Sequence, residues 1–314
     1  MIQRYLPYRL RNRIEAAIHA RAVDDIFDTP PIVPRNDGLV LFSMIGTKVV
    51  APYLVAVKSL WHQLGRGRIA LLDDGTLTAE DRAQLARHCG DPEIIDIASV
   101  ERGPFPKGGT WERLLTILDR RSSEYWIQLD SDTVTLGPVP EVEGAIARNR
   151  SFALLGGPEG EIGALPAGQI ARELYPDGRR DDHVQARIES RLDTIPAERE
   201  WKYLRGCSGF AGFAAMGQGR PLAAAFLAEM ERMIGKEATH EWGTEQVASN
   251  FQLANEPEPV LLPSARYINH FGEPWPADTA FLHFIGTKRH EGTAYVDASR
   301  QAIAMLREEA ERAA

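Results

Sequence analysis

The chain has only two cysteines, Cys89 and Cys207, among its 314 residues. Two thiols are too few for a disulfide framework or for a zinc site made of cysteines, and this scarcity is typical of proteins in a reducing compartment. Basic residues are also in deficit, because 36 Lys and Arg stand against 44 Asp and Glu and leave a formal net charge of -8. This balance argues against a nucleic-acid-binding protein, which would present a basic face or stripe.

Long apolar runs are missing as well. No stretch approaches the roughly eighteen apolar residues that a membrane-spanning helix needs, and the N-terminus lacks the apolar core of a signal peptide. We therefore expect a cytoplasmic protein.

Residues 1–36 form a basic, amphipathic segment that we expect to be helical. Apolar and aromatic residues alternate there with arginines, namely Arg4, Arg9, Arg11, Arg13 and Arg21. Such a segment could make peripheral contact with an anionic membrane, or it could pack on its own domain or on a second subunit of an oligomer. The acidic residues Asp24, Asp25 and Asp28 follow at once and favour packing.

The next part of the chain alternates between apolar runs and helical patterns. The expected strands cover residues 39–44, 68–72 and 93–97, and the expected helices cover 50–64 and 78–88. Gly65 is placed to end the first helix, and Thr78 with Asp81 forms the pattern of a capping box. Strands that alternate with helices predict an α/β fold with a mostly parallel central sheet flanked by helices.

A further apolar run, residues 125–129, ends abruptly in Asp130-Ser131-Asp132. The run reads as a buried strand, and ligands of parallel sheets bind just beyond the carboxyl ends of the strands. Two ionised carboxylates this close repel each other unless a cation neutralises them, and carboxylate oxygens favour a hard divalent ion. The sequence therefore predicts that Asp130 and Asp132 bind Mn²⁺ or Mg²⁺.

The remaining chain completes a single large domain, residues 37–296, followed by a charged helix over 297–314. Residues 156–200 are rich in Gly, Pro and charge and are interpreted as an insertion, a lid or a segment on the acceptor side. Residues 206–213 are dense in small side chains, which permits either close approach to a ligand or tight strand packing. Further helices are expected over 111–121, 141–148, 221–234 and 243–253, and further strands over 151–155, 260–263 and 280–286.

Several of these separated motifs resemble the GT-A-fold glycosyltransferases, and the pattern is closest to glycosyltransferase family 8. The resemblance covers about residues 39–289 and is most specific at 129–136, a D-x-D motif followed by an apolar β stretch. It implies a GT-A-like fold in which Asp130 and Asp132 hold a metal that bridges the two phosphates of a nucleotide-sugar. His283, in a stretch similar to the family's H-F-x-G-x-x-K motif, would be the third metal ligand.

The same resemblance implies the residues that bind the donor. The lysine of that motif holds the diphosphate in the family. It is matched here by Lys288, which comes one position early, or by Arg289, which occupies the family's lysine position. Glu245 and Gln246 match the acidic-Gln pair beside the reacting sugar carbon, with Glu where the family usually has Asp. The implied donor-binding set is Asp74, Arg113, Ser131, Gly209, Asn250, Gly286, Lys288 and Arg289. Asp74 could instead be a turn-forming residue before Gly75.

By this resemblance the protein would be a hexosyltransferase, with a UDP-sugar as the usual donor and a carbohydrate, lipid or protein as acceptor. The metal and a cation at 288 or 289 would stabilise the departing diphosphate. Family 8 implies retention of the anomeric configuration, whereas a glutamate at 245 could also serve as the base of an inverting enzyme.

Three other functions fit part of the pattern. Residues 130–134 match the D-x-D-x-[TV] motif of haloacid-dehalogenase phosphohydrolases, in which Asp130 would be the nucleophile and Asp132 the acid/base. That class carries the motif on its first strand, whereas here it follows about the fourth. A nucleotidyltransferase would need a Gly-rich basic loop after the first strand, which the chain lacks. A catalytically silent nucleotide-sugar-binding module would keep the fold without the chemistry.

Overall fold

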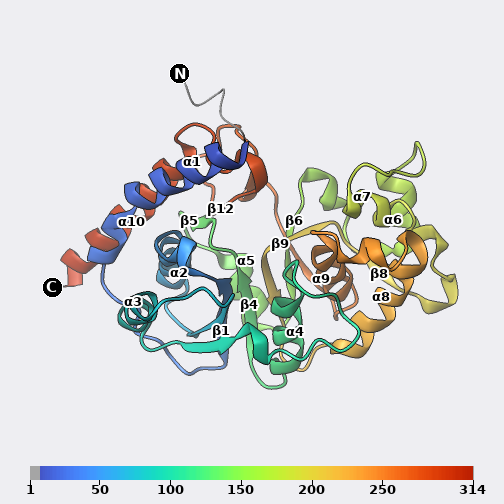
Figure 1. The fold of residues 1–314 in the computed structure, drawn as a ribbon, viewed down its shortest axis with the longest axis horizontal. Helices are drawn as coiled ribbons and strands as arrows, with labels where there is room; N and C mark the ends of the chain where they lie inside the picture. The colour runs from blue at the N-terminus through green and yellow to red at the C-terminus, as the bar shows by residue number, and fades with distance from the viewer. Residues whose placement is uncertain (1–7, 314) are drawn as a thin grey trace.

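The computed structural model describes residues 8–313, which fold around a seven-stranded sheet (Figure 1). The strand order is β10-β6-β9-β4-β1-β2-β3. The strands are β1 (Leu39–Ile45), β2 (Arg68–Asp73), β3 (Glu93–Asp96), β4 (Tyr125–Leu129), β6 (Phe152–Leu155), β9 (Gly206–Phe213) and β10 (Val260–Leu262). β1 pairs in parallel with β2 and β4, β2 with β3, and β6 with β10, whereas β9 runs antiparallel to both β4 and β6. The mostly parallel sheet predicted from the sequence is confirmed.

Ten α-helices of the described residues accompany this sheet, and most of them flank it. They are α1 (Tyr8–Ala22), α2 (Val50–Leu64), α3 (Ala79–Cys89), α4 (Trp111–Arg120), α5 (Pro140–Ala147), α6 (Ala167–Leu174), α7 (Val184–Glu189), α8 (Arg220–Ile234), α9 (Thr244–Ala254) and α10 (Ala294–Ala313). Gly65 ends α2 in the left-handed conformation, with φ of 61°. Thr78 and Asp81 form a complete capping box at the start of α3. Both local signals in the sequence were therefore interpreted correctly.

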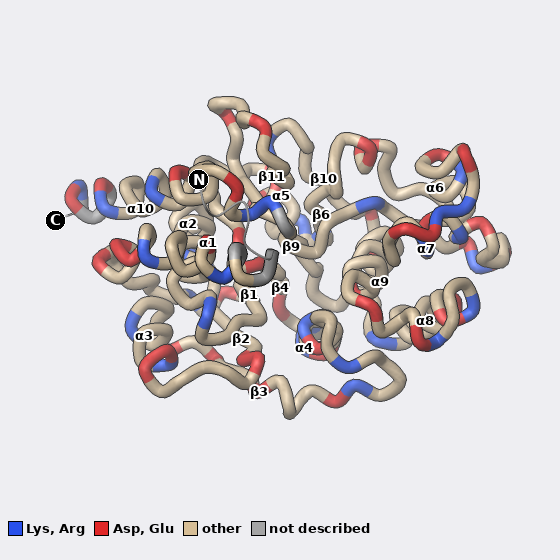
Figure 2. Tube along the Cα trace, turned by 45° about the horizontal axis from the view of Figure 1, so that its top comes forward, with Lys and Arg blue, Asp and Glu red and all other residues tan. Residues whose placement is uncertain are grey.

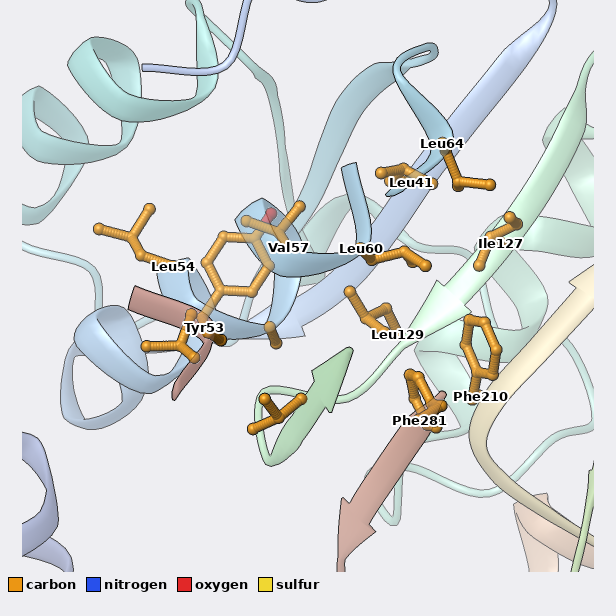
Figure 3. Packing of buried hydrophobic residues seen from close by; sticks show 14 of the residues in the cluster. Leu41, Tyr53, Leu54, Val57, Leu60, Leu64, Ile127, Leu129, Phe210 and Phe281 are labelled. Atoms are coloured by element: carbon orange, nitrogen blue, oxygen red, sulfur yellow. The ribbon is translucent and has the colours of Figure 1, made fainter. Parts of the chain in front are cut away.

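The core is built where α2 lies on the central strands. Figure 3 shows side chains of α2, including Leu60, facing Ile127 and Leu129 of β4. Phe210 of β9 stacks on Phe281, with ring centroids 4.2 Å apart and planes inclined by 16°. This stack joins the main sheet to a second, neighbouring sheet.

The second sheet is three-stranded, in the order β11-β12-β5. Its strands are β5 (Thr133–Thr135), β11 (Tyr267–His270) and β12 (Phe281–Phe284). β5 begins directly after Asp132 and pairs antiparallel with β12, so that His283 lies opposite Thr133. The sequence predicted β12 but not β11, because β11 is short and gains its stability by parallel pairing with β12.

Residues 156–200 are folded and packed. They contain α6, α7, several 3-10 turns and β7 (Leu165–Pro166), which pairs with β8 (Lys202–Tyr203). Ile170, Ile188 and Leu192 are buried in the same hydrophobic cluster as residues of α8 and α9. Figure 1 shows this part as a lobe beside α8 and α9. Whether the segment acts as an insertion in a single catalytic domain stays a prediction.

The first and last helices of the described chain pack on each other (Figure 1). The ring of His19 in α1 stacks on Tyr295 in α10 with centroids 3.7 Å apart, and His19 Nε2 lies 3.2 Å from Ser299 Oγ. α10 begins at Ala294, earlier than the expected 297, because Tyr295 and Ala298 are already buried against the core. Arg4 lies outside the described residues, as do the side chains of Arg9 and Arg11.

Charged residues of both signs are interleaved along the chain in Figure 2. Within residues 8–313, no helix is both long enough and apolar enough to cross a bilayer.

Candidate functional site

The two aspartates of the D-x-D motif lie at the carboxyl end of β4, in the middle of the main sheet. The backbone N–H of Asp130 donates to the carbonyl of Gly209 at 2.8 Å, and the hydroxyl of Ser43 in β1 donates to the Leu129 carbonyl at 2.7 Å. Asp132 is buried, whereas the side chain of Asp130 is 31% exposed. The end of β4 is thus held from both neighbouring strands, and one carboxylate still faces solvent.

His283 reaches the aspartates because β12 pairs with β5. The N–H of Phe284 donates to the Asp132 carbonyl at 2.9 Å, which sets the register. His283 Nε2 lies 3.4 Å from Asp132 Oδ1 and 3.9 Å from Asp130 Oδ2. One ligand atom from each of Asp130, Asp132 and His283 can be chosen so that all lie within 4.8 Å of one another. The structure therefore brings the predicted metal ligands together.

Two side chains contact the imidazole of His283 at Nδ1, the ring nitrogen away from the aspartates. Its Nδ1 lies 2.9 Å from Asn269 Oδ1 on β11 and 3.4 Å from the Cys207 sulfur. A hydrogen bond to Asn269 puts the proton on Nδ1 and leaves Nε2 facing the carboxylates. Gly209 makes room for the ring, because a Cβ at that position would lie 2.6 Å from His283 Nε2. Two carboxylates and an imidazole oriented in this way fit a divalent cation such as Mn²⁺ or Mg²⁺.

Each aspartate also forms an ion pair with an arginine. The guanidinium of Arg113, on α4, pairs with Asp130, and that of Arg289 pairs with Asp132. Arg289 also donates from Nε to the Phe284 carbonyl at 3.0 Å. Lys288 is exposed beside it. Of the two cations left open by the sequence, Arg289 is the one in contact with a candidate metal ligand.

The charges of this cluster act strongly on one another. Burial by itself would raise the pKa of the Asp132 carboxyl, but the neighbouring His283 and Arg289 outweigh it and lower that pKa to about 2. Burial by itself would lower the pKa of His283, but Cys207 and Asp132 raise it to about 10. A metal ion at Nε2 would need the neutral form of this imidazole, since only neutral imidazole is a ligand.

Glu245 and Gln246 lie in the first turn of α9 and differ in their surroundings. Glu245 is buried, where its Oε2 lies 3.2 Å from Arg113 Nη2 and accepts a hydrogen bond from Thr110 at 2.8 Å. Burial raises the pKa of the Glu245 carboxyl, an effect that Arg113 and Thr110 oppose. Within residues 8–313 the other oxygen, Oε1, has no hydrogen-bond partner.

Gln246 is half-buried and bridges two segments. Its Oε1 accepts from the N–H of Ser208 at 3.2 Å, and its Nε2 donates to Gln185 Oε1 on α7 at 2.9 Å. Asn250, one turn further along α9, donates to the Gly206 carbonyl at 3.0 Å and to the Tyr203 hydroxyl at 3.3 Å. Asn250 is buried and anchors β9 to α9.

The other predicted donor-binding residues lie in turns. Asp74 is exposed, and its carboxylate accepts from the Thr76 N–H at 3.0 Å, which is the turn-forming arrangement that the sequence left open. Gly286 has a φ of 58° and begins a 3-10 turn after β12. The carbonyl of Ser131 accepts a hydrogen bond from Tyr295 at 3.1 Å.

Sequence reasoning missed the residues that orient the others. Asn269, Cys207 and Tyr295 touch His283 or the D-x-D loop only through contacts between distant parts of the chain. No local pattern marks such residues. The small-residue density of 206–213 was the nearest signal, since β9 is where Cys207 and Gly209 approach the imidazole.

No protein-family model matches the chain, and no curated protein matches it in sequence. Solved structures do match. The galactosyltransferase LgtC, in complex with donor and acceptor sugar analogs, has a TM-score of 0.51 at 10% identity, covering 85% of this chain and 96% of that one. The glycosyltransferase GlyE of Streptococcus pneumoniae has a TM-score of 0.52 at 13% identity, covering 88% and 63%. At such identities the likeness shows the fold, and it confirms the expected GT-A-like architecture.

Proposed function

We propose that this chain, which has the fold of the GT-A glycosyltransferases, is a metal-dependent glycosyltransferase acting on a nucleotide-diphosphate sugar. The observation that carries this proposal is the cluster of Asp130, Asp132 and His283, whose ligand atoms lie within 4.8 Å of one another at the carboxyl end of β4. That end of a sheet is where α/β folds bind their ligands. A UDP-hexose is the expected donor, and the galactosyltransferase LgtC supports a hexose.

Asp130, Asp132 and His283 would hold the ion, Mn²⁺ in preference to Mg²⁺ because one ligand is an imidazole. When bound, the ion supplies Lewis-acid stabilisation of the charge that develops on the departing diphosphate. Asp130 is the more exposed of the two aspartates and so faces the side from which the donor would enter.

The cations of the chain complete the proposed donor site. Arg289 lies next to the candidate metal site and offers a planar guanidinium that can bind phosphate oxygens in a bidentate manner. Lys288 is exposed beside it and can add a point charge. Arg113 is buried between Asp130 and Glu245, so its first role is to hold these two carboxylates. Through Asp130 it would position the sugar-diphosphate end of the donor.

Of the two candidates on α9, Gln246 is better placed to face the reacting sugar. Its amide is half-buried and is fixed by Ser208 and Gln185, with one amide proton left to contact a ligand. Glu245 is buried and ion-paired with Arg113, which does not suit a base that must reach the acceptor hydroxyl. These contacts favour retention over inversion.

The phosphohydrolase alternative needs Asp130 as a free nucleophile and a second acidic cluster nearby. Asp130 is instead paired with Arg113. Asp181 and Asp182 are exposed and pair with Arg191 and Arg180. The structure offers no observation in favour of that chemistry.

The proposed function can be tested with a thermal-shift panel of UDP-, GDP-, ADP- and dTDP-sugars, each with Mn²⁺ and with EDTA. Binding to the folded state raises the melting temperature. We expect one nucleotide class to stabilise the protein in Mn²⁺ but not in EDTA. A shift that EDTA leaves intact would indicate a silent binding module. No shift with any donor, together with phosphate release from a phosphomonoester, would indicate a phosphohydrolase.

A matched variant tests the metal assignment. Asp132→Ala should remove the Mn²⁺-dependent shift by UDP-sugar, because the ion loses one of its three protein ligands. The far-ultraviolet circular dichroism spectrum should be unchanged, since Arg289 is partly exposed and can be solvated when its partner is removed. An Asp132→Ala protein that keeps its Mn²⁺-dependent donor affinity would refute the metal site.

A further inference from the structure

One tryptophan is exposed close to the candidate catalytic pair. Trp242 is 70% exposed, whereas the other five tryptophans of the chain are buried or half-buried. It precedes Glu245 by three positions, directly before the first turn of α9. An indole left in water forgoes a large gain from burial, because aromatic side chains bury more apolar area than most others. Its place in the sequence, three residues before Glu245, makes this exposed ring a candidate contact for a ligand of the site.

The backbone on both sides of Trp242 is fixed. Gly243 adopts a φ of 102°, which turns the chain into α9. The hydroxyl of Thr244 donates to the Thr239 carbonyl at 2.8 Å and accepts from Trp111 Nε1 at 3.1 Å. Glu241 pairs with Arg187 of α7 at 2.6 Å. The exposed ring thus stands on a rigid support, which keeps the entropic cost of binding low.

The backbone of Trp242 lies close to the first turn of α9, which carries Glu245 and Gln246. Three residues of chain span at most about 11 Å, so Trp242 cannot be further than that, measured between Cα atoms, from Glu245. Helix α7 packs against α9 (Figure 1), and a Cβ on Gly243 would lie 3.2 Å from Val184. Gln185, the next residue of α7, holds the amide of Gln246. Trp242 and α7 thus flank the first turn of α9.

The surroundings of Trp242 are polar. His183, His240 and Glu241 are all exposed. A protein-docking patch would add further large apolar side chains, whereas a single aromatic face among hydrogen-bonding groups suits a sugar. The C–H groups of a pyranose ring can stack on the indole face while its hydroxyl groups bind the polar neighbours.

We propose that Trp242 is the stacking platform for a carbohydrate acceptor, with α7 forming the opposite side of the acceptor site. This inference rests on the proposed glycosyltransferase function and adds the chemical class of the acceptor. It also gives residues 156–200 a role, because α7 is held against α9 by Arg187 and Gln185.

The test compares Trp242→Ala, Trp242→Phe and the control Met216→Ala with the unaltered protein. Met216 is 80% exposed, and its N–H donates to the carbonyl of Arg121, which precedes β4 and so lies at the opposite end of that strand from Asp130. Each protein is assayed with the donor identified above for hydrolysis by water and for transfer to p-nitrophenyl glycosides of glucose, galactose, N-acetylglucosamine, xylose and rhamnose. Tryptophan fluorescence is titrated with the same sugars as unsubstituted methyl glycosides.

In Trp242→Ala we expect the acceptor KM to rise by about fivefold or more, as for loss of one aromatic contact. The donor KM and the rate of donor hydrolysis should not change. Trp242→Phe should recover most of the acceptor affinity, and Met216→Ala should behave as the unaltered protein. The fluorescence change on adding the accepted glycoside should disappear in both Trp242 variants.

Two outcomes would overturn this inference while leaving the proposed function in place. One is donor hydrolysis with an unchanged acceptor KM in Trp242→Ala. The other is donor hydrolysis without transfer to any glycoside of the panel. If the unaltered protein turns over no donor at all, the proposed function fails first and the acceptor site fails with it.

Discussion

Arg113 and Arg289 form ion pairs with the two aspartates that would bind a metal. Arg113 pairs with Asp130 and Arg289 with Asp132, so each candidate ligand has a cationic partner within the chain. A divalent cation and a guanidinium compete for the same carboxylate oxygens. Arg289 is the more mobile candidate for displacement, because its side chain is 34% exposed and that of Arg113 only 4%. In the proposed function, an Arg289 released from Asp132 would be free to bind the diphosphate of the donor.

This competition gives the Arg289→Gln variant two effects of opposite sign. Without nucleotide, its affinity for Mn²⁺ should rise by about twofold to fivefold, since a partly exposed ion pair contributes up to ~1 kcal/mol. Its affinity for the nucleotide-sugar should fall, because a diphosphate ligand is lost. Titration of Mn²⁺ by electron paramagnetic resonance and of donor by calorimetry would measure both. Arg150→Gln, which breaks an exposed pair with Glu258, is the control. Weaker Mn²⁺ binding in Arg289→Gln would contradict the competition.

Gly209 is a second residue whose replacement should act on the ion. In Gly209→Ala the added methyl group would push on the His283 ring, and its misorientation should weaken Mn²⁺ binding by about tenfold or more. Gly219→Ala is a suitable control, because its Cβ would come no nearer than 3.6 Å to a neighbour. Equal Mn²⁺ affinities in the two variants would show that the imidazole is not a ligand.

Pairing between β5 and β12 decides where the third ligand lies. β5 and β12 are separated by well over a hundred residues of chain, yet their register places His283 opposite Thr133. Tyr295, in the first turn of α10, then ties this sheet to the D-x-D loop through its hydroxyl and stacks on Phe284 with centroids 4.6 Å apart. The geometry of the candidate metal site therefore depends on β5 and α10, which contribute no candidate ligand to it.

Two variants separate the contributions of Tyr295. Tyr295→Phe keeps the ring stacking and loses the hydrogen bond to the Ser131 carbonyl, so it should cost about 1 kcal/mol of stability and weaken Mn²⁺ binding. Tyr295→Ala also loses the stacking on Phe284 and His19 and should cost about 3 kcal/mol or more. Urea unfolding and Mn²⁺ titration would measure these effects. An unchanged Mn²⁺ affinity in Tyr295→Phe would restrict Tyr295 to packing.

The same elements explain how far the sequence could predict the structure. The helices and strands of the main sheet carry local signals, such as the apolar run before Asp130 and the capping residues Thr78 and Gly65. β11 carries none, because its stability comes from pairing with β12. The aspartates and His283 stand in recognisable motifs, whereas Asn269 acts only through a contact across two strands. The sequence therefore predicted the residues that stand in local motifs. It did not predict the residues that orient them through contacts between distant segments.

The packing of buried histidines should make the stability of the whole molecule depend on pH. Burial lowers the pKa of His19 to about 3 and that of His88 to about 4, from an ordinary value of 6.5. Between these values the unfolded chain binds protons that the folded chain does not, so the stability contributed by the neutral rings is full above pH 6.5 and is lost as the pH falls. His19 stacks between the first and last helices, which should separate first.

We expect the urea midpoint to fall between about pH 7 and pH 5, and to fall less steeply in His19→Gln. The glutamine does not gain a charge in this range, so it removes one proton-linked contribution. A variant with the same pH slope as the unaltered protein would show that His19 is already protonated or exposed in the folded state.

The long separation between β5 and β12 also has a consequence for synthesis. The ribosome delivers Asp130 and Asp132 long before His283 and Tyr295, and the strands β1, β2 and β4 can pair in the meantime. A growing chain therefore has the two carboxylates of the candidate metal site before it has the imidazole, which would complete that site only when β12 pairs with β5. In the proposed function, metal loading would therefore wait until the residues of β12 have been synthesised.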